Sequence, residues 1–149
     1  MPITRCLLAA ALASASAAAA AQAEQPPLTR TTSASGLPRA PQQEAVTFER
    51  AELSFKVDPA RKWLDGDASL TFRASRQVDR LVVDLDRNYA VERVEVDGKA
   101  IDAVHWRNPE GRMTVDLPAE LAAGGRTTLR IRYAGHPHVA KRAPWDGGF

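Results

Sequence analysis

The chain has 149 residues, 20 lysines and arginines against 18 aspartates and glutamates, a net charge of +2 and one cysteine. Charges of both signs are interspersed, and no predicted strand or helix carries a basic stripe, which argues against nucleic acid as a partner. Because the only cysteine is Cys6, residues 24–149 cannot form an internal disulfide, and a hydrophobic core must hold a single domain together.

The first 23 residues have the three-part layout of a secretory signal peptide. Residues 1–5 carry one positive charge, residues 6–21 are an uncharged run of mostly alanine, leucine and serine, and Ala21-Gln22-Ala23 supplies a cleavage pattern. The apolar run is too short and alanine-rich for a stable membrane span. We expect an exported protein, periplasmic or secreted, with no membrane span in its mature chain. The alternative is an alanine-rich helix kept in the mature protein.

Residues 24–44 form a predicted disordered linker. This segment is rich in proline and polar residues, including serine, and contains few large apolar side chains. Such a composition buries too little apolar surface to offset the entropy of ordering the chain. The folded part is expected to begin at about residue 45.

A hairpin is predicted from residue 51 to residue 72. Apolar and polar residues alternate in two runs, and the residues of the apolar set are Ala51, Leu53, Phe55, Val57, Leu64, Gly66, Ala68, Leu70 and Phe72. Asp58-Pro59-Ala60 lies between the runs, where Pro59 fixes φ and Asp58 can cap a turn with its side chain. The period of two predicts two strands with one buried face and one solvated face.

Alternation continues in later segments, which lie at residues 81–85, 91–96, 101–106, 113–117 and 129–133. Asp97-Gly98 is a dipeptide typical of tight type I′ hairpins, so residues 101–106 are predicted to be the returning strand. A further turn is predicted at residues 108–111. Only residues 118–125 have helical character, with Pro118 at the first position and a Gly-Gly stop, which predicts at most two helical turns.

These elements predict an all-β fold. About seven or eight short strands in antiparallel hairpins, with almost no helix, indicate a β-sandwich or saddle-like twisted sheets.

Two histidines flank a proline near the end of the chain. His136 and His138 could point the same way from an extended segment and offer two nitrogens to a metal, but zinc needs three or four ligands and His105 is the only other histidine. The simpler interpretation is a pair of loop histidines held by Pro137.

Carboxylates occur in pairs at Asp65 with Asp67 and at Asp84 with Asp86. Glycosidases use two carboxylates, but on opposing walls of a cleft and with one pKa raised by burial. Both pairs here alternate with core positions, which predicts a solvated face of the sheet. A G-x-S-x-G elbow, a phosphate-binding glycine loop and an H-E-x-x-H motif are all missing from the sequence.

The last residues are unusually apolar for a chain end. The sequence ends with Trp145, Asp146, Gly147, Gly148 and Phe149, in which large aromatic residues lie beside flexible glycines. Exposed aromatic groups usually mark a partner surface. Two interpretations remain open: these residues pack against something outside this chain, or they fold back on their own sheet.

Several stretches resemble the opening of the aminopeptidase-N-type gluzincin zinc metallopeptidases. The segment "AELSFKVDPARKWLDGDASLTFRAS" matches their first hairpin, with the pattern G-x-A-x-L-x-F supplied by Gly66, Ala68, Leu70 and Phe72. "VEVDGKAI" and "RMTVDLPAELAAGGRTTLRIRYAG" follow in the same order, and "PWDGGF" is similar to the link toward the catalytic domain. The resemblance covers residues 45–149.

The resemblance implies a saddle-like amino-terminal β domain at residues 45–140 and the start of a link at residues 141–149. In such enzymes this domain packs beside a catalytic domain that carries the zinc and hydrolyses amino-terminal peptide bonds. None of the catalytic motifs is present here, so no catalytic, cofactor or metal residue is carried over. The implied partner is that catalytic domain, with residues 145–149 as a possible domain interface and peptide substrate bound only by the intact enzyme.

The residues also allow another class of function. A self-sufficient exported β-sandwich could bind a protein or a glycan through tryptophans such as Trp63, Trp106 and Trp145. In either case we expect no enzymatic activity from this chain alone.

Overall fold

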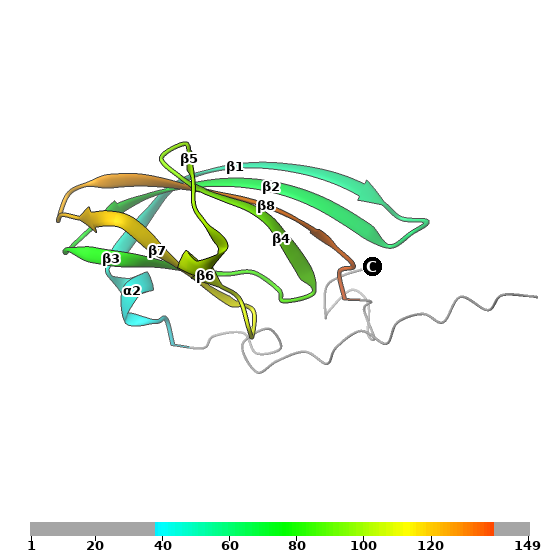
Figure 1. Cartoon of the computed structure of the whole chain (residues 1–149), viewed down its shortest axis with the longest axis horizontal. Helices are drawn as coiled ribbons and strands as arrows, with labels where there is room; N and C mark the ends of the chain where they lie inside the picture. Colours follow the sequence, from blue (N-terminus) through cyan, green and yellow to red (C-terminus); the bar gives the residue numbers. More distant parts are fainter. Residues whose placement is uncertain (1–37, 139–149) are drawn as a thin grey trace, which may run out of the picture.

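The computed structural model describes residues 38–138, which form two antiparallel β-sheets packed face to face (Figure 1). The larger sheet consists, in order across the sheet, of β1 (Val46–Asp58), β2 (Trp63–Ala74), β8 (Arg126–Gly135), β4 (Tyr89–Val96) and β5 (Lys99–Ala100). The smaller sheet consists of β3 (Val78–Asp84), β7 (Arg112–Leu121) and β6 (Trp106–Arg107). The predicted all-β sandwich is confirmed.

The predicted first hairpin is present as β1 and β2. The two strands pair along their whole length, from Val46 opposite Ala74 to Asp58 opposite Trp63. The Asp58 carboxylate caps the turn as expected, because its Oδ1 accepts a hydrogen bond of 3.1 Å from the backbone N–H of Arg61. A one-turn helix, α2 (Pro41–Glu44), precedes β1 within the segment predicted as linker.

The tight turn at Asp97-Gly98 is confirmed, but the predicted strand at residues 101–106 is wrong. Both turn residues have positive φ, 50° and 76°, and the returning strand β5 is only two residues long. The chain then makes a 3₁₀ turn, η1 (Ala103–His105), before Trp106 pairs with Val115 in the smaller sheet. This turn redirects the chain from the larger sheet to the smaller one, and the alternation of the sequence does not reveal the change.

The helix predicted at residues 118–125 is also wrong, because β7 continues to Leu121. Pairing of Leu121 with Val78 of β3 overrides the helical propensity of this stretch. Pro118 is tolerated because it lies where the β3–β7 register shifts and the ladder is irregular. The glycines after it form a turn in which Gly124 N–H donates to the Ala74 carbonyl at 2.8 Å.

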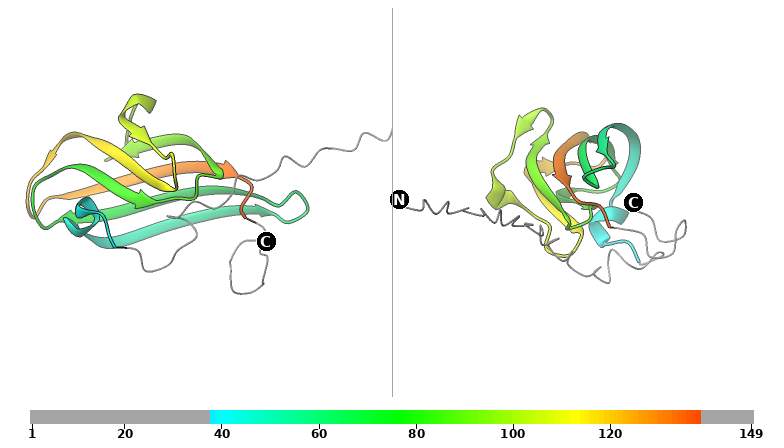
Figure 2. Two further views of the ribbon diagram at one scale, coloured as in Figure 1. Left: turned by 90° about the horizontal axis from the view of Figure 1, so that it is seen from below. Right: turned by 90° about the vertical axis from the view of Figure 1, so that its right-hand side faces the viewer.

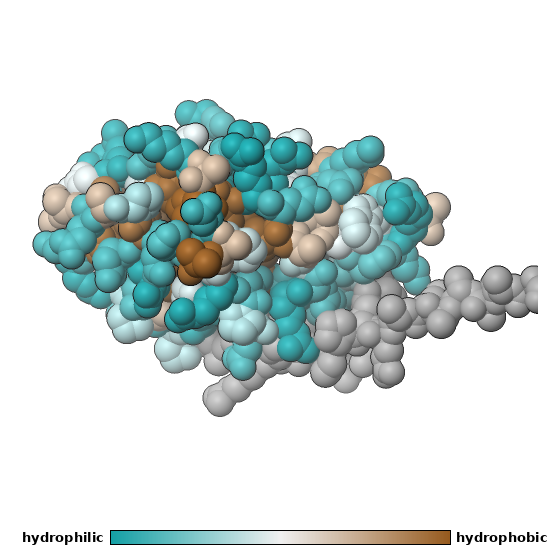
Figure 3. Space-filling model, in the orientation of Figure 1, coloured by the Kyte–Doolittle hydropathy of each residue, from teal (hydrophilic) through white to brown (hydrophobic). Residues whose placement is uncertain are grey.

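The core lies between the two sheets. Its largest fully buried side chains come from both layers and are Leu81, Val94, Met113, Val115 and Leu129. Hydrophilic residues cover most of the face seen in Figure 3, and apolar residues come to the surface along the gap between the sheets. Within the described residues, no helix is long and apolar enough to cross a membrane.

The sandwich is open at one end, where the β1–β2 hairpin extends past the strands of the smaller sheet (Figure 2). The predicted buried face is therefore wrong for most of β1. Leu53, Phe55 and Val57 are 55%, 51% and 50% exposed, although they lie on the side of the sheet that faces the core. No strand of the smaller sheet reaches far enough to cover them.

Candidate functional site

The exit of β8 brings the two predicted histidines to the open end of the sandwich. The ring of His136 lies against Trp63, edge to face, with the ring centroids 4.8 Å apart. Its Nδ1 donates a hydrogen bond of 2.9 Å to the backbone carbonyl of Lys62. His136 therefore fixes the last strand to the turn of the β1–β2 hairpin.

His138 is bound to the loop that joins β3 to β4. Its Nε2 donates to the Asp86 carboxylate at 2.9 Å, and its Nδ1 accepts from the Asn88 side-chain amide at 3.2 Å. The Asp86 carboxylate also accepts from the Asn88 backbone N–H at 3.0 Å. The His138 and Asp86 side chains are only 18% and 17% exposed. These contacts hold the segment after β8 against the β3–β4 loop, which connects the two sheets.

The histidines do not form a metal site. His136 and His138 have different partners, and His105 lies in η1. Among residues 38–138, no group of three or more histidine, cysteine, aspartate or glutamate side chains could hold a metal ion. The donor set does not fit zinc, which requires at least three protein ligands, so no catalytic step through zinc can be assigned to these residues.

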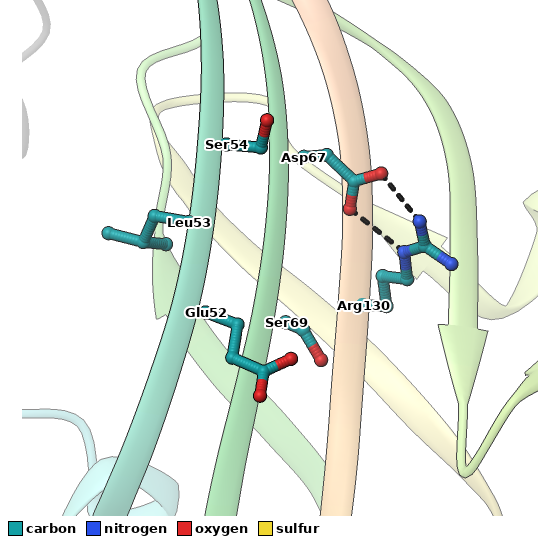
Figure 4. Close-up of a pocket in the computed structure, with 6 residues that line it drawn as sticks. All are labelled: Glu52, Leu53, Ser54, Asp67, Ser69 and Arg130. Atoms are coloured by element: carbon teal, nitrogen blue, oxygen red, sulfur yellow. Dashed lines mark hydrogen bonds and ion pairs between the residues drawn. The ribbon is translucent and has the colours of Figure 1, made fainter.

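The first acidic pair lies on the outer face of the larger sheet. Asp67 receives two hydrogen bonds from Arg130, of 2.8 and 2.7 Å, which hold the pKa of its carboxyl below the usual value (Figure 4). Asp65 accepts instead from the Trp63 indole N–H at 3.0 Å. Both carboxylates lie on one face of the same strand and are bound to other side chains, whereas glycosidases place two carboxylates on opposing walls of a cleft.

The second acidic pair is divided between two environments. Asp84 ends β3 and accepts hydrogen bonds from Gln43 and Arg112 at 3.2 and 3.3 Å. Asp86 lies in the following loop and binds His138, so it is largely covered and not on the predicted solvated face. The two carboxylates therefore act separately, each holding a neighbouring segment in place.

A surface that the sequence does not predict lies on the inner face of the β1–β2 hairpin. We call Leu53, Phe55 and Val57 the apolar row. Beside it, Tyr133 lies directly over Gly66 and packs against Tyr89 with ring centroids 5.2 Å apart. Burial raises the pKa of both phenols. β1 has 13 residues and β3 in the smaller sheet has 7, so part of β1 is left uncovered. The sequence gives no signal of this mismatch, because apolar and polar residues alternate in the same way in covered and uncovered strands.

The predicted interface residues, from Trp145 to Phe149, lie outside the described residues.

Solved structures that are similar to this chain include M1 zinc metallopeptidases. An M1 zinc metallopeptidase from Deinococcus radiodurans, bound to a Tyr-Ser-Ala substrate, matches with a TM-score of 0.60 and 26% identity over 72% of this chain. Another structure of that enzyme matches with 27% identity over the same share. Legionella pneumophila aminopeptidase A, in complex with aspartic acid, matches over 69% of this chain and 13% of its own, with a TM-score of 0.52 and 10% identity, which shows the fold alone.

No protein-family model and no curated protein matches the chain. The structural matches confirm the resemblance that the motifs indicate: this is the fold of a β domain of M1 zinc metallopeptidases. The chain spans about a quarter of the length of the Deinococcus enzyme, with 24% of that chain covered. The class is thus a peptidase-related β domain, and the described residues carry no metal centre of their own.

Proposed function

We propose that this chain is the non-catalytic amino-terminal domain of an exported zinc metallo-aminopeptidase-like protein. The match to one quarter of an M1 zinc metallopeptidase is the observation that carries the proposal. Some of the matched structures are of a two-domain M1 zinc metallopeptidase, which supports a second domain as the partner of this one. In that arrangement the β domain packs beside a catalytic domain, and residues 141–149 begin the link between them.

The chemistry belongs to the partner domain in this proposal. Zinc bound there would activate water for hydrolysis of an amino-terminal peptide bond, with a glutamate as general base. The β domain contributes surface and support, because its histidines and carboxylates are already engaged in structural contacts. The 149-residue chain should therefore show no zinc-dependent aminopeptidase activity when purified and supplied with zinc. Activity that a chelator removes and zinc restores would contradict this assignment.

The size and location of the native polypeptide test the proposal. An antibody raised against residues 38–138 should detect, in the producing cells, a protein several times larger than the 16.2 kDa of this chain. The band should be found in the exported fraction and not with cytoplasmic markers. A band of 16 kDa or less as the only product would contradict the two-domain arrangement, and a cytoplasmic band of any size would contradict export.

A self-sufficient binding module is the competing function, and the same preparation distinguishes it. A small exported band, together with a purified chain that retains a glycan or a peptide, would favour that class.

A further inference from the structure

The apolar row contains three of the five exposed large hydrophobic side chains among the described residues. Among residues 38–138, large apolar side chains that are about half exposed or more are limited to Phe48, Leu53, Phe55, Val57 and Val104. Four of these five belong to β1, and Phe48 has an aromatic partner in Phe72, with centroids 5.9 Å apart. Such a concentration on one strand indicates a surface that another segment covers.

The apolar row faces the same side as the core. Leu53 pairs with Ala68, Phe55 with Gly66 and Val57 with Leu64, which continue the inward-facing set of β2. Figure 4 shows Leu53 pointing away from Ser54 and Asp67, which lie on the polar outer face. The row is therefore an extension of the core that lacks its second layer.

The described part of the chain ends beside this row. His136 contacts Trp63, which pairs with Asp58, the residue directly after Val57. His138 binds Asp86 in the loop that connects the two sheets. The chain therefore leaves β8 at the open end and at the level of the space between the layers.

We propose that residues 139–149 fold back over the apolar row, with Trp145 and Phe149 packed on its side chains. Trp145 lies seven positions after His138, an extended reach of up to about 25 Å. The apolar row is about 13 Å long, since a strand rises about 3.3 Å per residue. The length and composition of this segment therefore match the uncovered surface, and its two aromatic side chains supply the missing apolar layer.

Of the two interpretations that the sequence leaves open, the proposal adopts the one in which the terminal residues fold back on their own sheet. The apolar residues at the end of the chain need a surface, and the structure provides an uncovered one where the chain leaves the sheet. The proposal does not depend on a catalytic domain, because the segment can cover the row in this chain alone or on its way to a following domain.

Disulfide trapping tests the contact in the full chain carrying Cys6→Ser. Leu53→Cys combined with Asp146→Cys should form an intramolecular disulfide, with a yield at least about threefold higher than the matched pair Ser54→Cys with Asp146→Cys. Ser54 is adjacent in sequence but lies on the opposite face of the sheet. Equal yields from the two pairs would overturn the proposal. Dimers linked through position 53 would overturn it as well, and would assign the row to a second copy.

A second measurement needs no change in the described residues. Trp145→Ser with Phe149→Ser should raise the fluorescence of an apolar-surface dye such as ANS about twofold or more, because the row becomes accessible. Lys141→Ser with Arg142→Ser is the matched control and should leave the dye signal unchanged. Far-UV circular dichroism checks that both variants keep the β fold. An unchanged dye signal in the folded aromatic variant would overturn the proposal without affecting the proposed function, which rests on the size of the native polypeptide.

Discussion

A single glycine explains part of the motif that relates this chain to the peptidases. A Cβ atom at Gly66 would lie 2.3 Å from Cζ and 2.5 Å from Cε2 of the Tyr133 ring, which packs on the glycine and against Tyr89. The small residue is required by the close approach of this ring and not by a special backbone angle. The sequence shows the glycine within an alternating pattern, but the contact joins strands that are far apart in the chain.

Replacement of this glycine should therefore destabilise the domain. We expect Gly66→Val to lower the free energy of unfolding by about 1–3 kcal/mol, because the new side chain must displace Tyr133 and separate it from Tyr89. Urea denaturation followed by circular dichroism measures the change. Ser69→Ala, on the outer face of the same strand, is the control and should have little effect. An unfolding midpoint of Gly66→Val equal to that of the wild type would contradict the packing described.

The Asp67–Arg130 pair predicts how stability depends on pH. Its hydrogen bonds, and the charge of Arg132 to a smaller degree, lower the pKa of Asp67 in the folded state below the value of about 3.9 for an unfolded chain. The pair therefore stabilises the fold fully above the unfolded pKa, and this contribution is lost as the pH falls through the lowered pKa.

Asp67→Asn should consequently reduce stability at neutral pH and lose its effect in acid. The reduction is expected to be below about 1 kcal/mol, since both side chains are partly exposed to solvent. Denaturation at pH 7 and at pH 2.5 checks this, with Asp65→Asn as the control on the same face. A difference between wild type and Asp67→Asn that grows as the pH falls would contradict the assigned direction of the pKa shift.

At the scale of the elements, the smaller sheet determines which parts of the larger one are buried. Met113 on β7 is fully buried between the layers. Met113→Ala should cost about 2–5 kcal/mol, because it removes buried methylene groups and leaves a cavity. Thr114→Ala, at the next position and on the other face of β7, serves as the control for thermal unfolding. Equal losses at the two positions would contradict the two-layer arrangement.

The periodicity of the sequence predicts the strands well, but not how they are distributed between sheets. The alternation from residue 51 to 72 correctly gives the first hairpin, yet β1 is largely exposed because the covering sheet is shorter. Residues 101–106 alternate like a strand, and the chain there passes from one sheet to the other. Residues 118–121 have helical propensity that pairing with β3 overrides. In each case, contacts distant in sequence decide the outcome.

The candidate sites follow the same rule at the scale of the whole molecule. The sequence suggests His136 and His138 as a possible metal-binding pair. Their hydrogen-bond partners, Lys62 and Asp86, lie 74 and 52 residues away in the chain. β8 lies between β2 and β4 in the larger sheet. For this reason His136 contacts the turn before β2, and His138 contacts the loop before β4. This explains why a possible metal pair in the sequence becomes two structural contacts in the fold.

We propose that this domain belongs to a longer zinc-peptidase-like polypeptide, and the reading frame after the Phe149 codon tests this proposal most directly. The frame should continue into a sequence that carries an H-E-x-x-H motif and a further zinc ligand. The whole polypeptide should be several times longer than this chain, which covers only 24% of the Deinococcus enzyme. A stop codon directly after Phe149, with no peptidase-coding sequence downstream, would contradict it.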